Sequence, residues 1–386
     1  MSNRSCSRGA RRCALLSLAA AFAFLLLASA TGASAASRGQ ALPEDFWGAV
    51  PQANLSAAQL KRVHRGGVES IRIPINWSNV QPTEGGAFDW AGVDDQVEMA
   101  ARGHVDLLPF MVGVPAWAEK LVYVGGSRES VQVPANLPVK GKARAGWLAF
   151  LRAAVDRYGS NGSFWSTHPD VPKRPIRNWQ IWNEPNFKYF VHRPDPAEYG
   201  QLVKISSNAI KSEDHRGKVI LAGLFVWPKG GETKHGNHNL FATDFLNRMY
   251  RQVPGIASRF DAVALHPYSP RYTYLPRQIR EVREVLKRRH DPKVGIWVTE
   301  MGWSSKPPAE NNSFAKGPAG QARELKGAFS LLVRNQRRWN VQRVYWFSID
   351  DYGTACNFCD GSGLFAAGFK PKRSWYAYVH FAGGRP

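Results

Sequence analysis

The sequence predicts an α/β fold, a single (β/α)8 TIM barrel, on three observations. Short apolar runs rich in β-branched residues alternate with helix-length amphipathic stretches, as in a parallel sheet built from βα units. Eight such runs occur, and a chain of 386 residues suits one barrel with loop insertions. No internal repeat, low-complexity tract or Pro/Ser-rich linker interrupts residues 41–386. We therefore expect residues 36–386 to form one domain.

Each predicted strand is a short apolar run bounded by turn-forming residues. In chain order the strands are Phe46–Val50, Ser70–Ile75, Val105–Val112, Trp179–Glu184, Val219–Leu224, Asp261–His266, Gly295–Glu300 and Val344–Ser348. The predicted helices are Ala57–His64, Val93–Ala101, Ala145–Tyr158, Pro196–Ser212, Leu240–Tyr250, Arg277–Arg289 and Gly320–Gln336. The helical period is clear where Ile279, Val282 and Leu286 share one face and arginines occupy the other.

The longest predicted connections follow strands three, four and five, at Gly113–Gly141, Pro185–Pro194 and Phe225–Asn239. They leave the carboxyl ends of the strands, where barrel active sites lie. Several Trp and Tyr residues occur in them. We expect these loops to build subsites for a substrate.

Residues 1–35 read as a secretory signal. Four arginines form a basic start, Ala14–Ala30 is apolar, and Ala33-Ser34-Ala35 offers a small-residue cleavage site. The Arg11-Arg12 pair also permits the twin-arginine route. Since no other stretch is long and apolar enough to span a bilayer, we expect a soluble protein, exported or secreted after cleavage near Ala35.

The formal net charge is +21, and four of the positive charges belong to the predicted signal. This surplus could attract an acidic polysaccharide, an anionic cell wall or nucleic acid. Alternatively it is a solvated surface, because basic residues are spread along helices, as in Arg277–Arg289 and Arg334–Arg343, without interleaved aromatic residues. We adopt the second interpretation and expect no nucleic-acid partner and a monomer.

The cysteine pattern predicts a small disulfide loop. Cys6 and Cys13 leave with the signal, so that Cys356 and Cys359 remain, and an oxidising compartment favours their pairing. A redox site would need a thioredoxin-like βα context, and a zinc site would need two further ligands. His235 and His238 lack a second ligand pair, and neither a phosphate-binding glycine loop nor a Gly-x-Ser-x-Gly elbow occurs. We expect no metal and no cofactor.

Two carboxylates mark the site. Glu184 lies in Ile181-Trp182-Asn183-Glu184-Pro185-Asn186 and Glu300 in Trp297-Val298-Thr299-Glu300-Met301-Gly302-Trp303, each at the end of an apolar run. Burying an ionised acid without partners is costly, so two at the ends of strands four and seven indicate a working pair. Glycosidic bond cleavage uses such a pair. Alternatively Glu184 is held by backbone N–H groups at a helix start, and Glu300 is paired structurally with an arginine.

These segments resemble clan A glycoside hydrolases, most closely the cellulase-like families and the xylosidase and iduronidase family. The resemblance covers about residues 44–380, is dense at the strand ends, and implies a (β/α)8 barrel. It also implies that Glu184, after Asn183 on strand four, is the acid/base, that Glu300 on strand seven is the nucleophile, and that the reaction retains configuration. Members of the second family often carry an accessory β-sandwich, which we do not expect in the few residues after His380.

The same resemblance assigns partners to the two carboxylates. Arg72 would lie beside the nucleophile and Tyr268 would donate to it, while Asn183 would bind the sugar 2-hydroxyl. Arg72 could instead form a structural salt bridge, and Asn183 could cap a turn.

His266 and the tryptophans complete the candidate site. His266 would orient or contact the sugar, or else be a satisfied structural group. Trp346 on strand eight would floor the sugar site. Trp117, Trp227 and Trp303 are further candidates for stacking on sugar, or else ordinary core residues.

The sequence thus predicts a retaining β-glycosidase that hydrolyses a poly- or oligosaccharide by double displacement. Export and the loop aromatics favour endo action on a polymer over exo action on small glycosides. The alternative is a non-catalytic carbohydrate- or cell-wall-binding protein on a barrel scaffold. The presence of both glutamates and Asn183 argues against it, since a binding protein needs no acid/base pair.

Overall fold

The computed structural model describes residues 41–126, 129–226, 240–310, 312–351 and 359–386. The chain divides into two units, Met1–Ala41 and Leu42–Pro386, and the second is described here. The predicted signal with Cys6 and Cys13 lies outside the described residues, as do Trp227, His235, His238 and Cys356.

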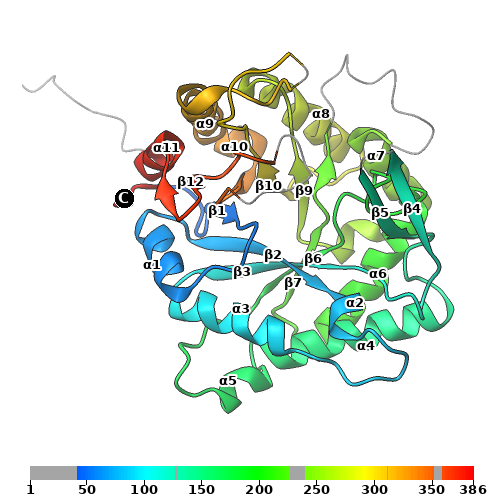
Figure 1. Ribbon diagram of the computed structural model, residues 1–386. Coiled ribbons are helices and arrows are strands. Elements are labelled where there is room, and N and C mark those ends of the chain that lie inside the picture. The colour runs from blue at the N-terminus through cyan, green and yellow to red at the C-terminus, as the bar shows by residue number, and fades with distance from the viewer. Residues whose placement is uncertain (1–40, 127–128, 227–239, 311, 352–358) are drawn as a thin grey trace, which may run out of the picture. The chain divides into compact units, whose positions relative to one another are not determined.

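Eight parallel strands close into a barrel, as predicted (Figure 1). They are β1 (Trp47–Val50), β2 (Ser70–Asn76), β3 (Asp106–Val112), β6 (Asn178–Ile181), β7 (Lys218–Leu221), β9 (Ala262–His266), β10 (Gly295–Met301) and β11 (Val341–Phe347). Neighbours pair in this order, and closure comes from the pairing of β11 with β1. All barrel pairings are parallel, so every strand ends at the same mouth of the barrel.

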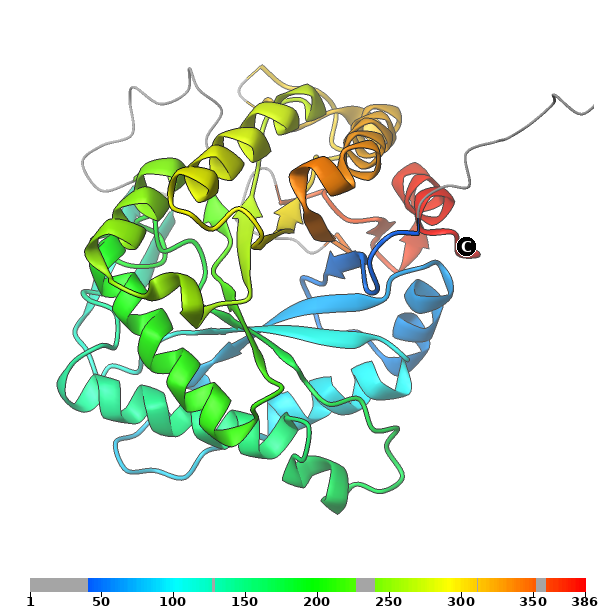
Figure 2. The same cartoon turned by 180° about the vertical axis from the view of Figure 1, so that it is seen from behind.

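Helices surround the barrel (Figures 1 and 2). The main ones are α1 (Ala57–Arg65), α3 (Ala91–Arg102), α4 (Gly141–Tyr158), α6 (Pro196–Glu213), α7 (Ala242–Gln252), α8 (Leu275–Arg288), α9 (Gly317–Arg334) and α11 (Arg373–Ala382). Shorter ones are α2 (Trp77–Val80), α5 (Ser163–Thr167), η2 (Ile256–Arg259), η3 (Tyr272–Tyr274) and α10 (Gln336–Trp339). Their apolar faces pack on the strands in one continuous cluster that contains Trp47, Ile75, Trp179 and Phe329.

Three predicted strand boundaries were wrong by three residues, and the other boundaries differ by at most one residue. The strand predicted over Trp179–Glu184 ends at Ile181, because Trp182 has a φ of 75°, outside the extended region. The strand predicted over Val219–Leu224 ends at Leu221, and Leu224–Phe225 forms a separate short strand, β8, on β9. The last barrel strand begins at Val341 rather than Val344, since Val341 already pairs with Ile296.

The connection after β3 holds an antiparallel hairpin that the sequence analysis missed. Its strands are β4 (Leu121–Gly126) and β5 (Glu129–Pro134), which pair with each other and with no barrel strand. A second small pair, β12 (Phe365–Ala366) with β13 (Lys370–Pro371), precedes α11. Among the described helices, none combines the length and hydrophobicity needed to cross a bilayer.

Candidate active site

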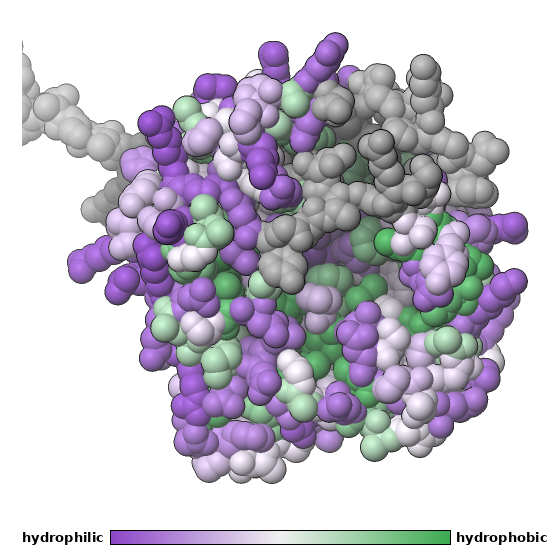
Figure 3. Space-filling model, viewed as in Figure 1, coloured by the Kyte–Doolittle hydropathy of each residue, from purple (hydrophilic) through white to green (hydrophobic). Residues whose placement is uncertain are grey.

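Glu184 and Glu300 meet at the carboxyl ends of the strands. Glu184 follows β6 closely, and Glu300 is the penultimate residue of β10. One oxygen of each carboxylate and a ring nitrogen of His266 lie within 4.8 Å of one another. The side chains are 8% and 13% exposed, so both groups are largely withdrawn from water. Figure 3 shows one face of the molecule, largely hydrophilic with hydrophobic residues near its centre.

A strained turn presents Glu184. Trp182 and Glu184 have φ values of 75° and 39°, a backbone region that bulky side chains rarely adopt. The turn is held from outside: Asn186 donates to the carbonyls of Phe225 and Leu240, both at 2.9 Å, and accepts from the Phe225 amide at 3.0 Å. The cost of the backbone conformation is therefore offset by a buried brace.

Glu300 receives two donors, as the resemblance implied. Arg72 on β2 donates from Nη1 to Oε1 at 2.6 Å, and the Tyr268 hydroxyl donates to Oε2 at 2.8 Å. Both contacts favour the ionised carboxylate.

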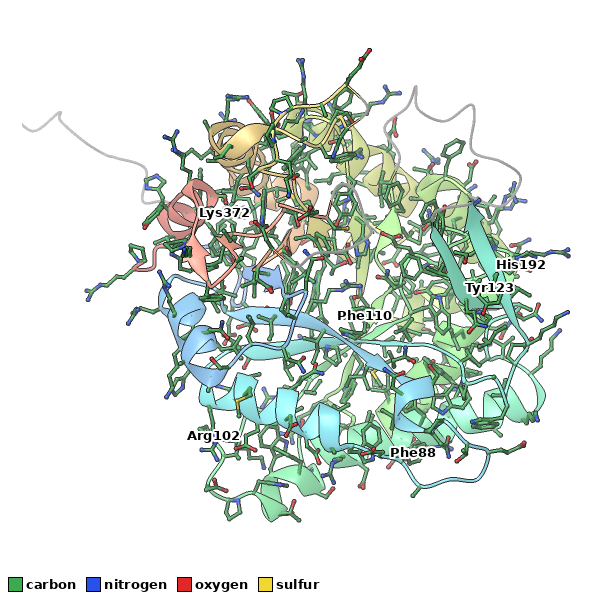
Figure 4. All side chains as sticks on the ribbon, viewed as in Figure 1. Phe88, Arg102, Phe110, Tyr123, His192 and Lys372 are labelled. Carbon is green, nitrogen blue, oxygen red and sulfur yellow. The ribbon has the colours of Figure 1, made fainter. Side chains whose placement is uncertain are left out.

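Arg72 also organises the groups beside Glu300. Its Nε donates to Gln180 and its Nη2 to Oδ1 of Asn183, each at 2.6 Å. Because a guanidinium only donates, Asn183 must turn its oxygen toward Arg72, which leaves its Nδ2 group as a donor. Beneath lies Phe110 of β3, whose ring centre is 4.0 Å from the guanidinium carbon and which sits centrally in Figure 4. Arg72 therefore serves as both salt bridge and scaffold.

Glu184 contacts His266 of β9. Nδ1 of the fully buried imidazole lies 2.6 Å from Oε1 of Glu184, and Nε2 lies 3.0 Å from the hydroxyl of Thr299. The ring reaches this position because residue 223 is glycine: a Cβ there would lie 1.9 Å from Nε2. Burial, and then the charge of Arg72, lower the pKa of His266 well below its usual value. His266 is thus a neutral hydrogen-bond partner, not half of an ion pair.

The contacts of Thr299 select the imidazole tautomer. The hydroxyl oxygen of Thr299 accepts a hydrogen bond from Nε2 of Gln180 at 3.4 Å. Among the described residues, the acceptor for the hydroxyl proton of Thr299 is Nε2 of His266. His266 then carries its proton on Nδ1 and donates to Oε1 of Glu184. An acidic proton on Glu184 is consequently confined to the other oxygen, Oε2.

The two carboxylates differ in their affinity for a proton. Burial, and then the charge of Glu300, raise the pKa of Glu184 well above its usual value, with Arg72 opposing. Burial raises the pKa of Glu300 as well, but Arg72 and Tyr268 counteract it. Burial also raises the pKa of Tyr268, which stays a neutral donor. One shared proton therefore belongs on Glu184, with Glu300 ionised.

The side chains of the site also resemble a set of metal ligands. Glu184, His266 and Glu300 together offer three ligand atoms, a number that can hold a cation. Yet the guanidinium of Arg72 already neutralises Glu300 at 2.6 Å, and a second positive charge in the same buried space would be repelled. The donor set fits proton chemistry better than metal chemistry.

Trp346 does not floor this site, contrary to the sequence prediction. On β11 the side chains of Tyr345 and Phe347 point into the barrel, so Trp346 between them points outward. It is fully buried against Phe329 of α9 and donates to the carbonyl of Ser362 at 3.1 Å. It therefore offers no surface to a ligand, whereas Phe347 is half-buried and its ring centre lies 6.3 Å from that of Tyr268.

Two further tryptophan candidates are core residues. Trp303 is buried and donates to the Ser269 carbonyl at 2.8 Å. Trp117 is half-buried, packs against Trp77 and donates to the Gln81 carbonyl at 3.1 Å. Cys359 is disulfide-bonded, and Cys356, its predicted partner, lies outside the described residues.

Sequence reasoning missed Gln180, Thr299 and Phe110. Each lies on a barrel strand that was correctly predicted, and polar Gln180 and Thr299 stand out within apolar runs. A buried polar residue must find a partner, so these two positions carried a usable signal. Phe110 carried none, because a phenylalanine in a strand is ordinary core.

The family described as glycosyl hydrolase catalytic core matches residues 159–376, more than half of the chain. The chain belongs to this family. The glycosyl hydrolase core is 26% identical over 222 residues to a β-xylosidase from Geobacillus stearothermophilus, an alignment that covers 53% of this chain and 41% of that protein. It thus spans less than half of that relative.

Solved structures share the fold of this glycosyl hydrolase core. A family 39 glycoside hydrolase from Bacteroides cellulosilyticus WH2 matches 88% of the chain with a TM-score of 0.62 and 20% identity, over 64% of its own length. A β-xylosidase of the same family from Caulobacter crescentus matches 89% with a TM-score of 0.60 and 19% identity, over 72% of its length.

Proposed function

We propose that this chain is a retaining β-glycosidase in which Glu300 is the nucleophile and Glu184 the acid/base. One observation carries the proposal: two buried carboxylates face each other at one barrel mouth, and Glu300 is hydrogen-bonded to the Arg72 cation whereas Glu184 contacts a neutral imidazole. Their oxygens lie within 4.8 Å. This supports retention, for which the carboxyl groups are about 5–5.5 Å apart, over inversion, which needs ~6.5–9.5 Å.

In the first step, ionised Glu300 attacks the anomeric carbon while the bond to the leaving oxygen breaks. Glu184 gives its proton from Oε2 to that oxygen, so the leaving group departs as a neutral alcohol. Asn183 offers its Nδ2 donor to the sugar 2-hydroxyl. Arg72 and Tyr268 keep Glu300 anionic until the ester bond forms.

In the second step, the roles at Glu184 reverse. The glycosyl ester removes the negative charge of Glu300, which was one cause of the raised pKa of Glu184. Glu184, now ionised, takes a proton from water, the oxygen of that water attacks the anomeric carbon, and Glu300 leaves as a carboxylate. Two inversions at one carbon give net retention.

The substrate class is a β-linked poly- or oligosaccharide. The β-xylosidase relative makes β-xylosides the first substrates to test. The apolar and basic start of the sequence supports export from the cytoplasm. A purely carbohydrate-binding role has no use for the unequal proton affinities of Glu184 and Glu300.

Glu300→Gln and Glu184→Ala test the assigned roles. Glu300→Gln should abolish turnover of aryl β-glycosides. Glu184→Ala should lower the turnover rate about 10²–10⁴-fold on substrates with poor leaving groups and much less on substrates with activated leaving groups. Azide should restore part of the turnover rate of this variant. NMR of the first product anomer reports the stereochemistry.

The matched control is Glu324→Gln, since Glu324 is also buried but lies on α9 and accepts a bond from the Tyr272 amide rather than from a residue of the site. It should keep full activity. Equal losses on activated and unactivated substrates in Glu184→Ala would contradict the acid role, and an inverted product would contradict retention.

A further inference from the structure

Positive charge gathers in a cavity at the other end of the barrel, where the strands begin. The cavity has a volume of about 750 Å³ and is bounded by the starts of β1, β3, β6, β7 and β11. Its lining residues are Glu44, Asp45, His104, Asp106, Leu107, Pro172, Lys173, Arg174, Pro175, Arg177, Asn178, Arg216, Lys218 and Arg343. Six of these are lysine or arginine and three are acidic.

Two of the acids are already neutralised. Asp45 pairs with Arg343 and Asp106 with Arg174, each at 2.7 Å. In the described part of the chain, no ion pair engages Lys173, Arg177 or Lys218, and all three side chains are exposed. Glu44, the remaining acid of the lining, can offset one of these three charges, so the cavity keeps a positive surplus.

The backbone that carries these three residues is fixed. The Lys218 amide donates to the Arg177 carbonyl at 2.6 Å, and Lys218 lies opposite Asn178 in the parallel register. The green loop from α5 to β6, visible in Figure 2, holds Lys173 between Pro172 and Arg174, and its Ile176 is buried. A rigid loop loses little conformational entropy when a ligand binds.

We propose that this cavity binds an acidic polysaccharide through its carboxylate groups, independently of the catalytic mouth. A volume of about 750 Å³ can hold a few sugar units. Guanidinium and ammonium groups bind carboxylates by charge-assisted hydrogen bonds. Among the described lining residues, the single aromatic ring is that of His104, so the cavity offers little surface for stacking nucleic-acid bases. A polymer held here leaves the opposite mouth open to substrate.

The experiment measures binding of polygalacturonate, neutral dextran and duplex DNA to the full protein at low salt. Wild type should bind polygalacturonate, and binding should weaken as the Debye length shrinks from about 10 Å at 0.1 M to about 3 Å at 1 M salt. Lys173→Ala/Arg177→Ala/Lys218→Ala should bind about tenfold more weakly, as expected for three partly exposed ion pairs. Dextran should not bind.

The matched control is Lys61→Ala/Arg323→Ala/Lys326→Ala, which removes the same charge from exposed helix positions. It should bind like wild type, and both variants should turn over a neutral aryl glycoside like wild type. Equal losses of polygalacturonate binding in the two triple variants would show that binding depends only on net charge, and would contradict the proposed site. So would absence of polygalacturonate binding, or tighter binding of DNA than of polygalacturonate. Because the readout is binding, the outcome does not depend on the proposed catalytic roles.

Discussion

At the scale of single residues, the candidate site is a buried hydrogen-bond network in which each side chain fixes the next. Arg72 holds Glu300, Asn183 and Gln180, while Gln180 and Thr299 lead to His266 and Glu184. Such networks gain strength in a low-dielectric interior but tolerate no missing member. Substitutions within this network should therefore alter protonation as well as position.

Arg72→Met should shift the pH profile of kcat/KM upward. The positive charge of Arg72 lowers the pKa of both Glu300 and Glu184. Without it, Glu300 loses its proton only at higher pH, so the acid limb moves up, and Glu184 keeps its proton longer, so the alkaline limb moves up too. Activity at the optimum should fall about 10²-fold. Arg72→Lys, which keeps the charge, should restore the position of the limbs; an unshifted profile in Arg72→Met would count against this account.

Thr299→Val tests whether the tautomer of His266 matters. Valine keeps the shape but gives Nε2 of His266 no hydroxyl, so the proton need not stay on Nδ1. We expect kcat to fall about tenfold on substrates with poor leaving groups and to change little on activated substrates, because the substitution weakens general acid catalysis. Thr299→Ser should recover the rate. A loss that serine does not repair would point to packing instead.

At the scale of elements, the barrel strands set the positions of the side chains of the site, and the turns after the strands set their orientation. Glu300 needs only to stand at the end of β10, whereas Glu184 depends on the turn after β6. That turn is held by Asn186 through three hydrogen bonds to the backbone of Phe225 and Leu240. The second asparagine of the Trp-Asn-Glu-Pro-Asn string is therefore a brace.

Asn186→Ala should lower the free energy of unfolding by about 2–4 kcal/mol, because three half-buried backbone groups lose their hydrogen bonds to Asn186. Urea unfolding measures the change. The control is Asn208→Ala, an exposed position whose side chain accepts from Arg259 at 2.8 Å, where we expect a change within about 0.5 kcal/mol. Equal stability changes in the two variants would show that Asn186 does not brace the turn.

At the scale of the whole molecule, the barrel separates two ends with different surfaces. One end carries the paired glutamates, and the other carries the basic cavity. Helices elsewhere spread their charge over local pairs such as Arg277 with Glu281 and Lys287 with Glu284. Such pairs cancel within each helix, and the interpretation of the net charge of +21 as a solvated surface stays a prediction.

Export can be tested on the whole chain. We expect cleavage after Ala35, so that the mature protein found outside the cytoplasm begins at Ala36. Ala35→Arg should block processing, because the cleavage site requires a small residue, while Ser34→Gln, at the tolerant middle position, should not. N-terminal sequencing of the extracellular fraction measures both. An unprocessed wild-type protein retained in the cytoplasm would refute the signal.

The sequence by itself determined the barrel, the strands that carry the two glutamates, and the two donors to Glu300, Arg72 and Tyr268. These features are local or periodic: apolar runs mark strands, and turn residues mark their ends. Asn183 and Tyr268 stand just beyond such ends, whereas Arg72 lies within β2. Parallel strands bring all these ends to one mouth, so proximity follows without knowledge of any contact.

Only the tertiary structure decided which way each side chain faces and what it touches. Trp346 faces the helices because the register of β11 on β1 directs Tyr345 and Phe347 inward, and register is set by pairing across the sheet. The bonds from Gln180 and Thr299 to Arg72 and His266 join four strands that are far apart in sequence. No local pattern encodes such contacts, because they depend on the closure of the whole barrel.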